Sequence, residues 1–281
     1  LKIMMIRLKL GLLFALLSIH CWGSAPIRFL LTFDDGPSGS EFANPSAQVL
    51  ATLANNSTQA GIKAIFFVQT RANRSGATEI GQQIMQREFA EGHILAFHTA
   101  TPQHRSHRDL SDDELASALQ NGSVDIARIT GSAPQFVRPP FWSYDARTLA
   151  AYQQHGMQML LTDLSAVDGK IWGVNFSLQK HRNLKQQLAD LRPRWLAGEL
   201  PVVDGYTPIV VTFHDLNRYT ALVLDEYLQI LCQVAAELAI PTASRAFYSD
   251  KAELERAALA STTHELARPQ VISGFWNRLM Q

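Results

Sequence analysis

Short apolar runs rich in β-branched and aromatic residues recur along this chain, and helix-like stretches separate them. This alternation is typical of repeated βαβ units around a parallel sheet. At 281 residues the chain is long enough for one large α/β domain with a single core. Seven or so units favour a single distorted (β/α)7-8 barrel over an open sheet. The expected strands are residues 27–33, 62–68, 94–97, 135–137, 157–161, 209–213 and a weak last one near Ile240.

Two of the intervening helices carry capping signals. Ser111 followed by Glu114 is a capping box, and it predicts a helix that runs toward Ile129. Asp145 predicts the start of another helix, which ends near Gly156, where a glycine tolerates a left-handed cap.

Two segments stand outside the regular alternation. Residues 163–206 are longer than an ordinary connection, include a helix expected at 184–195, and are rich in aromatic side chains. Long connections in compact domains are usually either functional or disordered. Residues 251–281 predict a C-terminal helical tail that is broken at Pro269.

The first 25 residues have the layout of a secretory signal peptide. Basic residues precede an apolar run at 10–19, and the small residues Gly23, Ser24 and Ala25 follow it. The run is too short to span a bilayer comfortably, so we expect no transmembrane span in the mature chain. A buried helix and a lipid anchor at Cys21 are the alternatives. We therefore expect residues 1–25 to be a signal peptide, 26–250 a catalytic domain and 251–281 the tail, in a periplasmic or secreted protein.

Charge excludes one class of partner. Acidic and basic side chains number 25 each, so the chain has no basic field that would attract nucleic acid or an anionic membrane. Cys232 is the only thiol after the signal, which rules out a disulfide within the mature chain.

Two adjacent carboxylates, Asp34 and Asp35, close the first expected strand just before Gly36 and Pro37. Neighbouring side chains on a strand normally point to opposite faces, but a Gly-Pro turn relaxes that rule. One carboxylate can then bind a cation while the other accepts a proton. The alternative is a turn with two solvated carboxylates.

Histidines follow the third expected strand, at His98, His104 and His107. Imidazole is the commonest metal-binding side chain, and a catalytic zinc site needs three protein ligands and an open position. One aspartate and two histidines would complete that set. Surface histidines are the alternative, but the active sites of barrels are built where strands end.

Arg138 and His214 also follow expected strands. The charge of an arginine cannot be lost, which suits it to hold an acidic base in place, and a histidine at a strand end is a natural proton donor. A surface ion pair and a buried structural histidine are the alternatives.

Together these segments resemble the polysaccharide deacetylase family, also called the NodB-homology domain or carbohydrate esterase family 4. The resemblance covers about residues 27–248 and rests on motifs that occur in the family's order. These are TFDDGP at 32–37, His98-Thr99, RPPF at 138–141, an aspartate loop from Asp163, and a strand that ends in His214.

The resemblance implies roles for individual residues. It implies that Asp34 is the general base, that Arg138 orients Asp34, and that His214 is the general acid. Asp35 and His98 would be metal ligands. The cofactor would be a divalent metal, which we expect to be Zn²⁺.

The third ligand is where the chain departs most from the family. The family has its second histidine four residues after the first, where this chain has Pro102. In the family the second histidine usually lies about six residues before a leucine that precedes a helix-opening serine. The resemblance therefore implies, from Leu110 and Ser111, that His104 is the third ligand after a two-residue insertion, with His107 as the alternative.

The substrate-binding motifs also differ. The family has a glycine where this chain has Trp142, and its adjacent Asp-Trp pair appears only as Asp163, Asp168 and a separated Trp172. The residues expected to contact substrate are Phe141, Trp142, Tyr144, Asp163 and Trp172. The resemblance implies hydrolysis of N-acetyl groups on an N-acetylglucosamine-containing glycan, with release of acetate. An amino-sugar-binding barrel that has lost its metal and a small-molecule amidase of the same fold are the alternatives.

Overall fold

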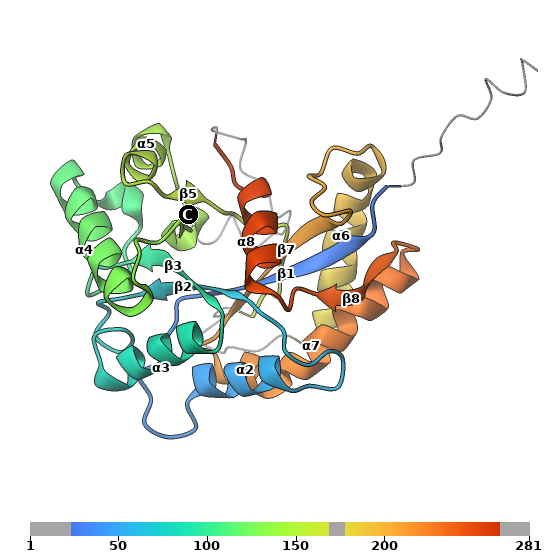
Figure 1. Ribbon diagram of the computed structural model, residues 1–281, viewed down its shortest axis with the longest axis horizontal. Helices are drawn as coiled ribbons and strands as arrows, with labels where there is room; N and C mark the ends of the chain where they lie inside the picture. The colour runs from blue at the N-terminus through green and yellow to red at the C-terminus, as the bar shows by residue number, and fades with distance from the viewer. Residues whose placement is uncertain (1–23, 169–177, 265–281) are drawn as a thin grey trace, which may run out of the picture.

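The computed structural model describes residues 24–168 and 178–264, in which parallel strands alternate with helices (Figure 1). The strands are β1 (Ile27–Asp34), β2 (Ile65–Gln69), β3 (Ile94–Thr99), β4 (Phe136–Val137), β5 (Gln158–Met159), β6 (Leu164–Ser165), β7 (Thr207–His214) and β8 (Thr242–Phe247). The helices are α2 (Pro45–Ala54), α3 (Glu79–Ala90), α4 (Asp112–Thr130), α5 (Ala146–Gln154), α6 (Lys180–Leu196), α7 (Arg218–Glu237) and α8 (Lys251–Ala260).

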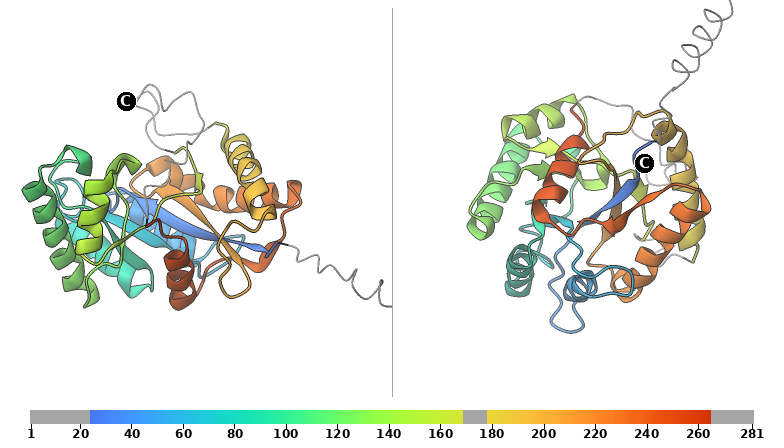
Figure 2. Two further views of the ribbon diagram at one scale, coloured as in Figure 1. Left: turned by 90° about the horizontal axis from the view of Figure 1, so that it is seen from above. Right: turned by 45° about the vertical axis from the view of Figure 1, so that its right-hand side comes forward.

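The strands form one curled parallel sheet in the order β5-β4-β3-β2-β1-β7-β6, and β8 pairs with β1. β1 lies at the centre, with β7 along its whole length and β2 and β8 sharing its other edge. Helices surround the sheet, as two further views show (Figure 2). In the described residues no ladder joins β5 to β6, so the sheet does not close completely. The prediction of a distorted (β/α) barrel of seven or eight units is confirmed.

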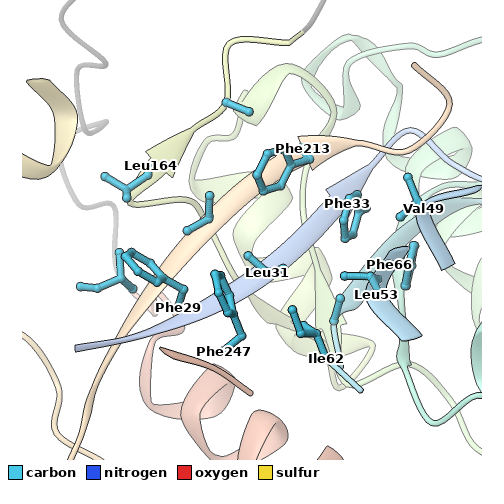
Figure 3. Close-up of a cluster of buried hydrophobic side chains, with 14 of the residues drawn as sticks. Phe29, Leu31, Phe33, Val49, Leu53, Ile62, Phe66, Leu164, Phe213 and Phe247 are labelled. Atoms are coloured by element: carbon cyan, nitrogen blue, oxygen red, sulfur yellow. The ribbon is translucent and has the colours of Figure 1, made fainter. Parts of the chain in front are cut away.

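The outer face of the sheet packs against the helices. Alternate residues of β1 point to this side, because successive side chains on a strand point to opposite faces. Figure 3 shows Phe29, Leu31 and Phe33 of β1 among side chains from α2 and β7. Burying one such side chain contributes about 1.5–3 kcal/mol, so this cluster is a major part of the stability.

The inner face of the barrel is closed by α8. Leu254, Ala257 and Ala258 of this helix pack against the alternate set of strand residues, which includes Leu30 and Val210. α8 therefore belongs to the same folded body as the strands. The division of the chain at residue 250 stays a prediction.

The C-terminal helix is shorter than expected. It ends at Ala260, well before Pro269, which lies outside the described residues. The reason is a competing pairing: the Thr263 N–H donates to the carbonyl of Met159 at 2.8 Å, and the Thr262 hydroxyl donates to Gln158 at 3.1 Å. The chain leaves the helix to pair with β5.

The capping predictions are confirmed. Ser111 and Glu114 form a reciprocal capping box at the start of α4, and the Asp145 side chain caps α5. The strand β6 was not predicted, because two residues carry no detectable periodicity. None of the described helices has the length and apolarity needed to cross a bilayer. The predicted signal peptide lies outside the described residues.

Candidate active site

The site is built where β1, β3 and β7 end. Asp34 pairs in register with His214, so the two side chains leave neighbouring strands at the same level. Asp35 has a left-handed backbone with φ of 70°, which turns its carboxylate away from the strand's alternation. Gln69 secures this turn, since its side-chain amide donates to the Asp35 carbonyl at 2.8 Å and its N–H donates to the Gly36 carbonyl at 2.7 Å.

Asp35, His98 and His104 form the one group in the described residues that can hold a metal ion, and their ligand atoms lie within 4.8 Å of one another. The Asp35 Oδ1 atom lies 3.0 Å from His98 Nε2 and 3.2 Å from His104 Nε2. His98 Nδ1 is held by the Arg138 carbonyl at 2.8 Å, which makes Nδ1 the protonated nitrogen. The lone pair of His98 Nε2 therefore faces the group.

This donor set fits a divalent cation. The two Nε2 atoms lie 3.2 Å apart and face the same carboxylate oxygen, an arrangement that a shared cation satisfies. Burial raises the pKa of Asp35, but His98, His214 and His104 together hold it well below its ordinary value. Burial lowers the pKa of His104, which favours the neutral imidazole that a metal requires.

His107, the alternative third ligand, lies apart from this group. It is fully buried, its ring stacks on Phe97 at 5.8 Å, and its Nδ1 bonds to the Tyr152 hydroxyl at 2.8 Å. Burial lowers its pKa to about 3, so it is a neutral core side chain. The structure brings His104, and not His107, to Asp35.

Asp34 and Arg138 form a buried ion pair beside the metal group. The two side chains are 2% and 0% exposed, and Arg138 Nη1 lies 2.8 Å from Asp34 Oδ1. The same nitrogen bonds to the hydroxyls of Thr32 at 2.7 Å and Thr212 at 2.9 Å. Nε and Nη2 donate to the backbone carbonyls of residues 160–161. Hydrogen bonds to β1, to β7 and to the residues that follow β5 thus fix the guanidinium, and the guanidinium in turn fixes the Asp34 carboxylate.

His214 is paired with Asp168. Its Nδ1 lies 2.8 Å from Asp168 Oδ1, and its backbone N–H donates to Oδ2 at 2.9 Å. The Thr220 hydroxyl donates to the same Oδ2 at 2.6 Å. Burial lowers the pKa of His214, but Asp168, followed by Asp35 and Asp34, raises it to about 10. The free Nε2 faces Asp35 Oδ2 at 3.9 Å.

Asp168 was not among the predicted site residues. In the sequence it stood out only beside Asp163, as one of two candidates for the aspartate of the family's Asp-Trp pair. It lies 46 residues from His214, and local sequence signals do not pair residues at that separation.

Two of the predicted substrate-contacting aromatic residues lie beside the site. The Phe141 side chain is 62% exposed, and its ring centre lies 4.6 Å from that of His104. The Trp142 indole N–H donates to Asp34 Oδ2 at 3.2 Å. Tyr144 is partly buried and packs against the hydrophobic core.

Asp163 lies away from the metal group. Its carboxylate accepts the Val210 N–H at 2.9 Å, and Val210 pairs with Leu30 in the middle of the sheet. Burial raises the pKa of Asp163 to about 6. Trp172 lies outside the described residues.

The fold and the site define a (β/α)-barrel protein with a candidate metal centre at the carboxyl ends of its strands. Residues 25–160 match the family model described as polysaccharide deacetylase. This match confirms the resemblance to the polysaccharide deacetylase family that the motifs indicated.

Named relatives agree with this family. The chain is 30% identical over 148 residues to a chitin deacetylase from Pestalotiopsis sp., covering 52% of this chain and 44% of that one. It is 28% identical over 200 residues to the chitin deacetylase of Colletotrichum lindemuthianum, covering 70% and 71%. A peptidoglycan-N-acetylglucosamine deacetylase from Bacillus cereus is 31% identical over 128 residues, covering 43% and 41%. The chain thus spans less than half the length of two of these three relatives.

Solved structures share the fold. The Colletotrichum lindemuthianum chitin deacetylase has a TM-score of 0.57 at 23% identity, covering 79% of this chain and 86% of that one. A family 4 carbohydrate esterase from Streptomyces lividans, solved with acetate, has a TM-score of 0.52 at 21% identity, covering 78% and 92%.

Proposed function

We propose that this protein is an exported, metal-dependent hydrolase that removes N-acetyl groups from an N-acetylglucosamine-containing polysaccharide or oligosaccharide and releases acetate. One observation carries the proposal: the Asp35, His98 and His104 group lies beside the buried Asp34–Arg138 ion pair and beside the partly buried His214, which Asp168 holds. The named relatives, which include chitin and peptidoglycan deacetylases, support the substrate class. The arrangement of residues 1–25 supports export.

Asp35, His98 and His104 would hold the cation. One oxygen and two imidazole nitrogens are a donor set that zinc accepts in catalytic sites, which keep a further position open. A bound zinc ion supplies Lewis acidity, which polarises the amide carbonyl and eases the deprotonation of water.

Asp34 would accept the proton of the attacking water. Its Oδ1 is held by Arg138, whose permanent charge balances the carboxylate inside the barrel. Because both side chains are almost completely buried, the carboxylate keeps one orientation toward the metal group.

His214 would protonate the leaving amine. Its Nδ1 is fixed by Asp168, so the Nε2 proton is the one directed into the site. The Asp168 contact also stabilises the charged imidazolium. Asp34 and His214 come from paired positions on β1 and β7, which lets one take a proton and the other give one on the same bound amide.

Space for a sugar lies next to the loop that carries His104. An open pocket of about 420 Å³ is lined by Ser38, Gln69, Asn73, Arg74, Pro102 and Leu216, among others. Pro102 belongs to the loop that carries His104, and Leu216 follows His214. The exposed Phe141 ring, whose centre lies 4.6 Å from that of His104, offers an apolar face on which a sugar ring can stack.

The test is acetate release from N-acetylglucosamine oligomers and from peptidoglycan fragments by purified protein of verified zinc content. We expect acetate from at least one substrate, its loss after chelation, and its return with added zinc. His104→Ala should abolish the activity, whereas His181→Ala, which removes an exposed histidine paired with Glu237, should not. Binding of the oligomers without any acetate would favour the sugar-binding barrel. Acetate from small N-acetyl amides alone would favour the amidase.

A further inference from the structure

The backbone at the rim of the site is strained at two successive residues. Phe141 and Trp142 have φ of 60° and 53°, and in the described part of the chain no other two adjacent non-glycine residues are both left-handed. Side chains larger than hydrogen disfavour this region, and such strain persists only where the surroundings impose it. Glycine would adopt this conformation without steric cost, whereas tryptophan cannot. The strained backbone at Trp142 therefore indicates that its side chain makes an interaction that offsets this cost.

The strained turn directs the Trp142 indole at Asp34. The indole N–H donates to Asp34 Oδ2 at 3.2 Å, while Arg138 holds Oδ1 at 2.8 Å. One hydrogen bond to a carboxylate leaves it free to rotate about its Cβ–Cγ bond. Two donors from two different positions, one on each oxygen, fix the plane of the group.

A fixed plane matters here because Asp35, the neighbouring residue, belongs to the metal group. An Asp34 carboxylate that rotates would offer its free oxygen to the same cation as a fourth protein ligand. It would then no longer be placed to accept a proton, and the open position of the site would be lost.

We propose that Trp142 is a positioning residue, whose indole N–H holds the second oxygen of Asp34 and keeps that carboxylate in one orientation. This inference rests on the proposed function, since it assigns Trp142 to the residue that would act as the base. It differs from a sugar-stacking role for Trp142, because stacking acts on substrate affinity and positioning acts on turnover.

The variant Trp142→Phe separates the two roles. Phenylalanine keeps an aromatic face at the same backbone position but has no N–H. Since a well-placed general base contributes about 100-fold or more to the rate, we expect kcat to fall about 10- to 100-fold with KM changed less than about twofold. Trp142→Gly, which relieves the left-handed strain, should lose kcat to the same extent. Trp195→Phe is the matched control: this indole belongs to α6 and packs in the hydrophobic core, so the variant should keep kcat.

A second readout needs neither substrate nor metal. The Trp142 indole N–H resonance in a ¹⁵N-labelled protein is identified by its absence from Trp142→Phe. Because it bonds to a carboxylate, it should shift when Asp34→Asn removes the charge, while the Trp195 resonance should stay in place.

Two results would overturn the inference: a Trp142→Phe variant with unchanged kcat and raised KM, or an indole resonance that does not respond to Asp34→Asn. If the wild-type protein releases no acetate with zinc bound, the proposed function fails, and the resonance alone decides whether Trp142 holds Asp34.

Discussion

The ion pair between Arg138 and Asp34 is almost completely buried, so we expect the loss of either partner to destabilise the fold. Arg138→Met keeps an unbranched apolar side chain but removes all the guanidinium contacts, and it leaves the Asp34 charge buried and uncompensated. Breaking a buried ion pair by removing one partner costs about 3–5 kcal/mol. For a chain of this size about 1 kcal/mol shifts Tm by about 2–4 °C, so we expect a fall in Tm of about 6–20 °C.

The measurement is thermal and urea unfolding followed by circular dichroism. Arg138→Met combined with Asp34→Asn removes both charges, and it should recover at least about 1–3 kcal/mol relative to the sum of the single variants. Arg71→Met is the matched control: Arg71 pairs with Asp125 at 2.6 Å but is 40% exposed, so its loss should cost no more than about 1 kcal/mol. An Arg138→Met variant as stable as the Arg71→Met variant would show that the buried pair does not contribute this stability.

Three further predictions concern single side chains. Glu88 is fully buried with both oxygens unpartnered, and burial raises its pKa well above the ordinary value. The free energy of unfolding should therefore fall as pH rises above the unfolded-state pKa of about 4.5. Glu88→Gln should flatten this pH dependence when unfolding is measured from pH 5 to 9, and an unchanged slope would contradict the prediction. Asp168→Asn should lower kcat about 100-fold or more by releasing His214, as measured by acetate formation, and near-normal turnover would remove Asp168 from the mechanism. Competitive zinc titration should show that His104→Phe loses zinc affinity while His107→Phe keeps it, and the reverse order would make His107 the ligand.

Much of this architecture could be predicted from local sequence signals. Strand patterns and capping residues depend on neighbours in the chain, so the alternation of strands and helices and the capping boxes at Ser111 and Asp145 were confirmed. The family resemblance rested on motifs at strand ends, where a barrel gathers its functional side chains. The spacing between the family's second histidine and the following leucine, applied to Leu110, favoured His104 over His107. The structure places His104 beside Asp35.

What the sequence did not reveal depends on contacts between distant segments. The tail helix ends at Ala260 because Thr263 pairs with β5, a pairing that spans about a hundred residues of chain. Asp168 reaches His214 only after β6 and β7 have paired. The indole of Trp142 finds Asp34 through two left-handed residues, a conformation that sequence preferences argue against.

The central claim is that one cation held by Asp35, His98 and His104 is required for the release of acetate. The most direct measurement is a titration of zinc into metal-free protein with an N-acetylglucosamine oligomer present, following acetate and bound zinc together. We expect activity to rise with zinc and to reach its plateau at about one equivalent per chain, as a single three-ligand site requires. The Asp35→Asn variant should neither bind zinc nor gain activity when zinc is added. Acetate released at the full rate by metal-free protein, or zinc bound equally well by Asp35→Asn, would contradict it.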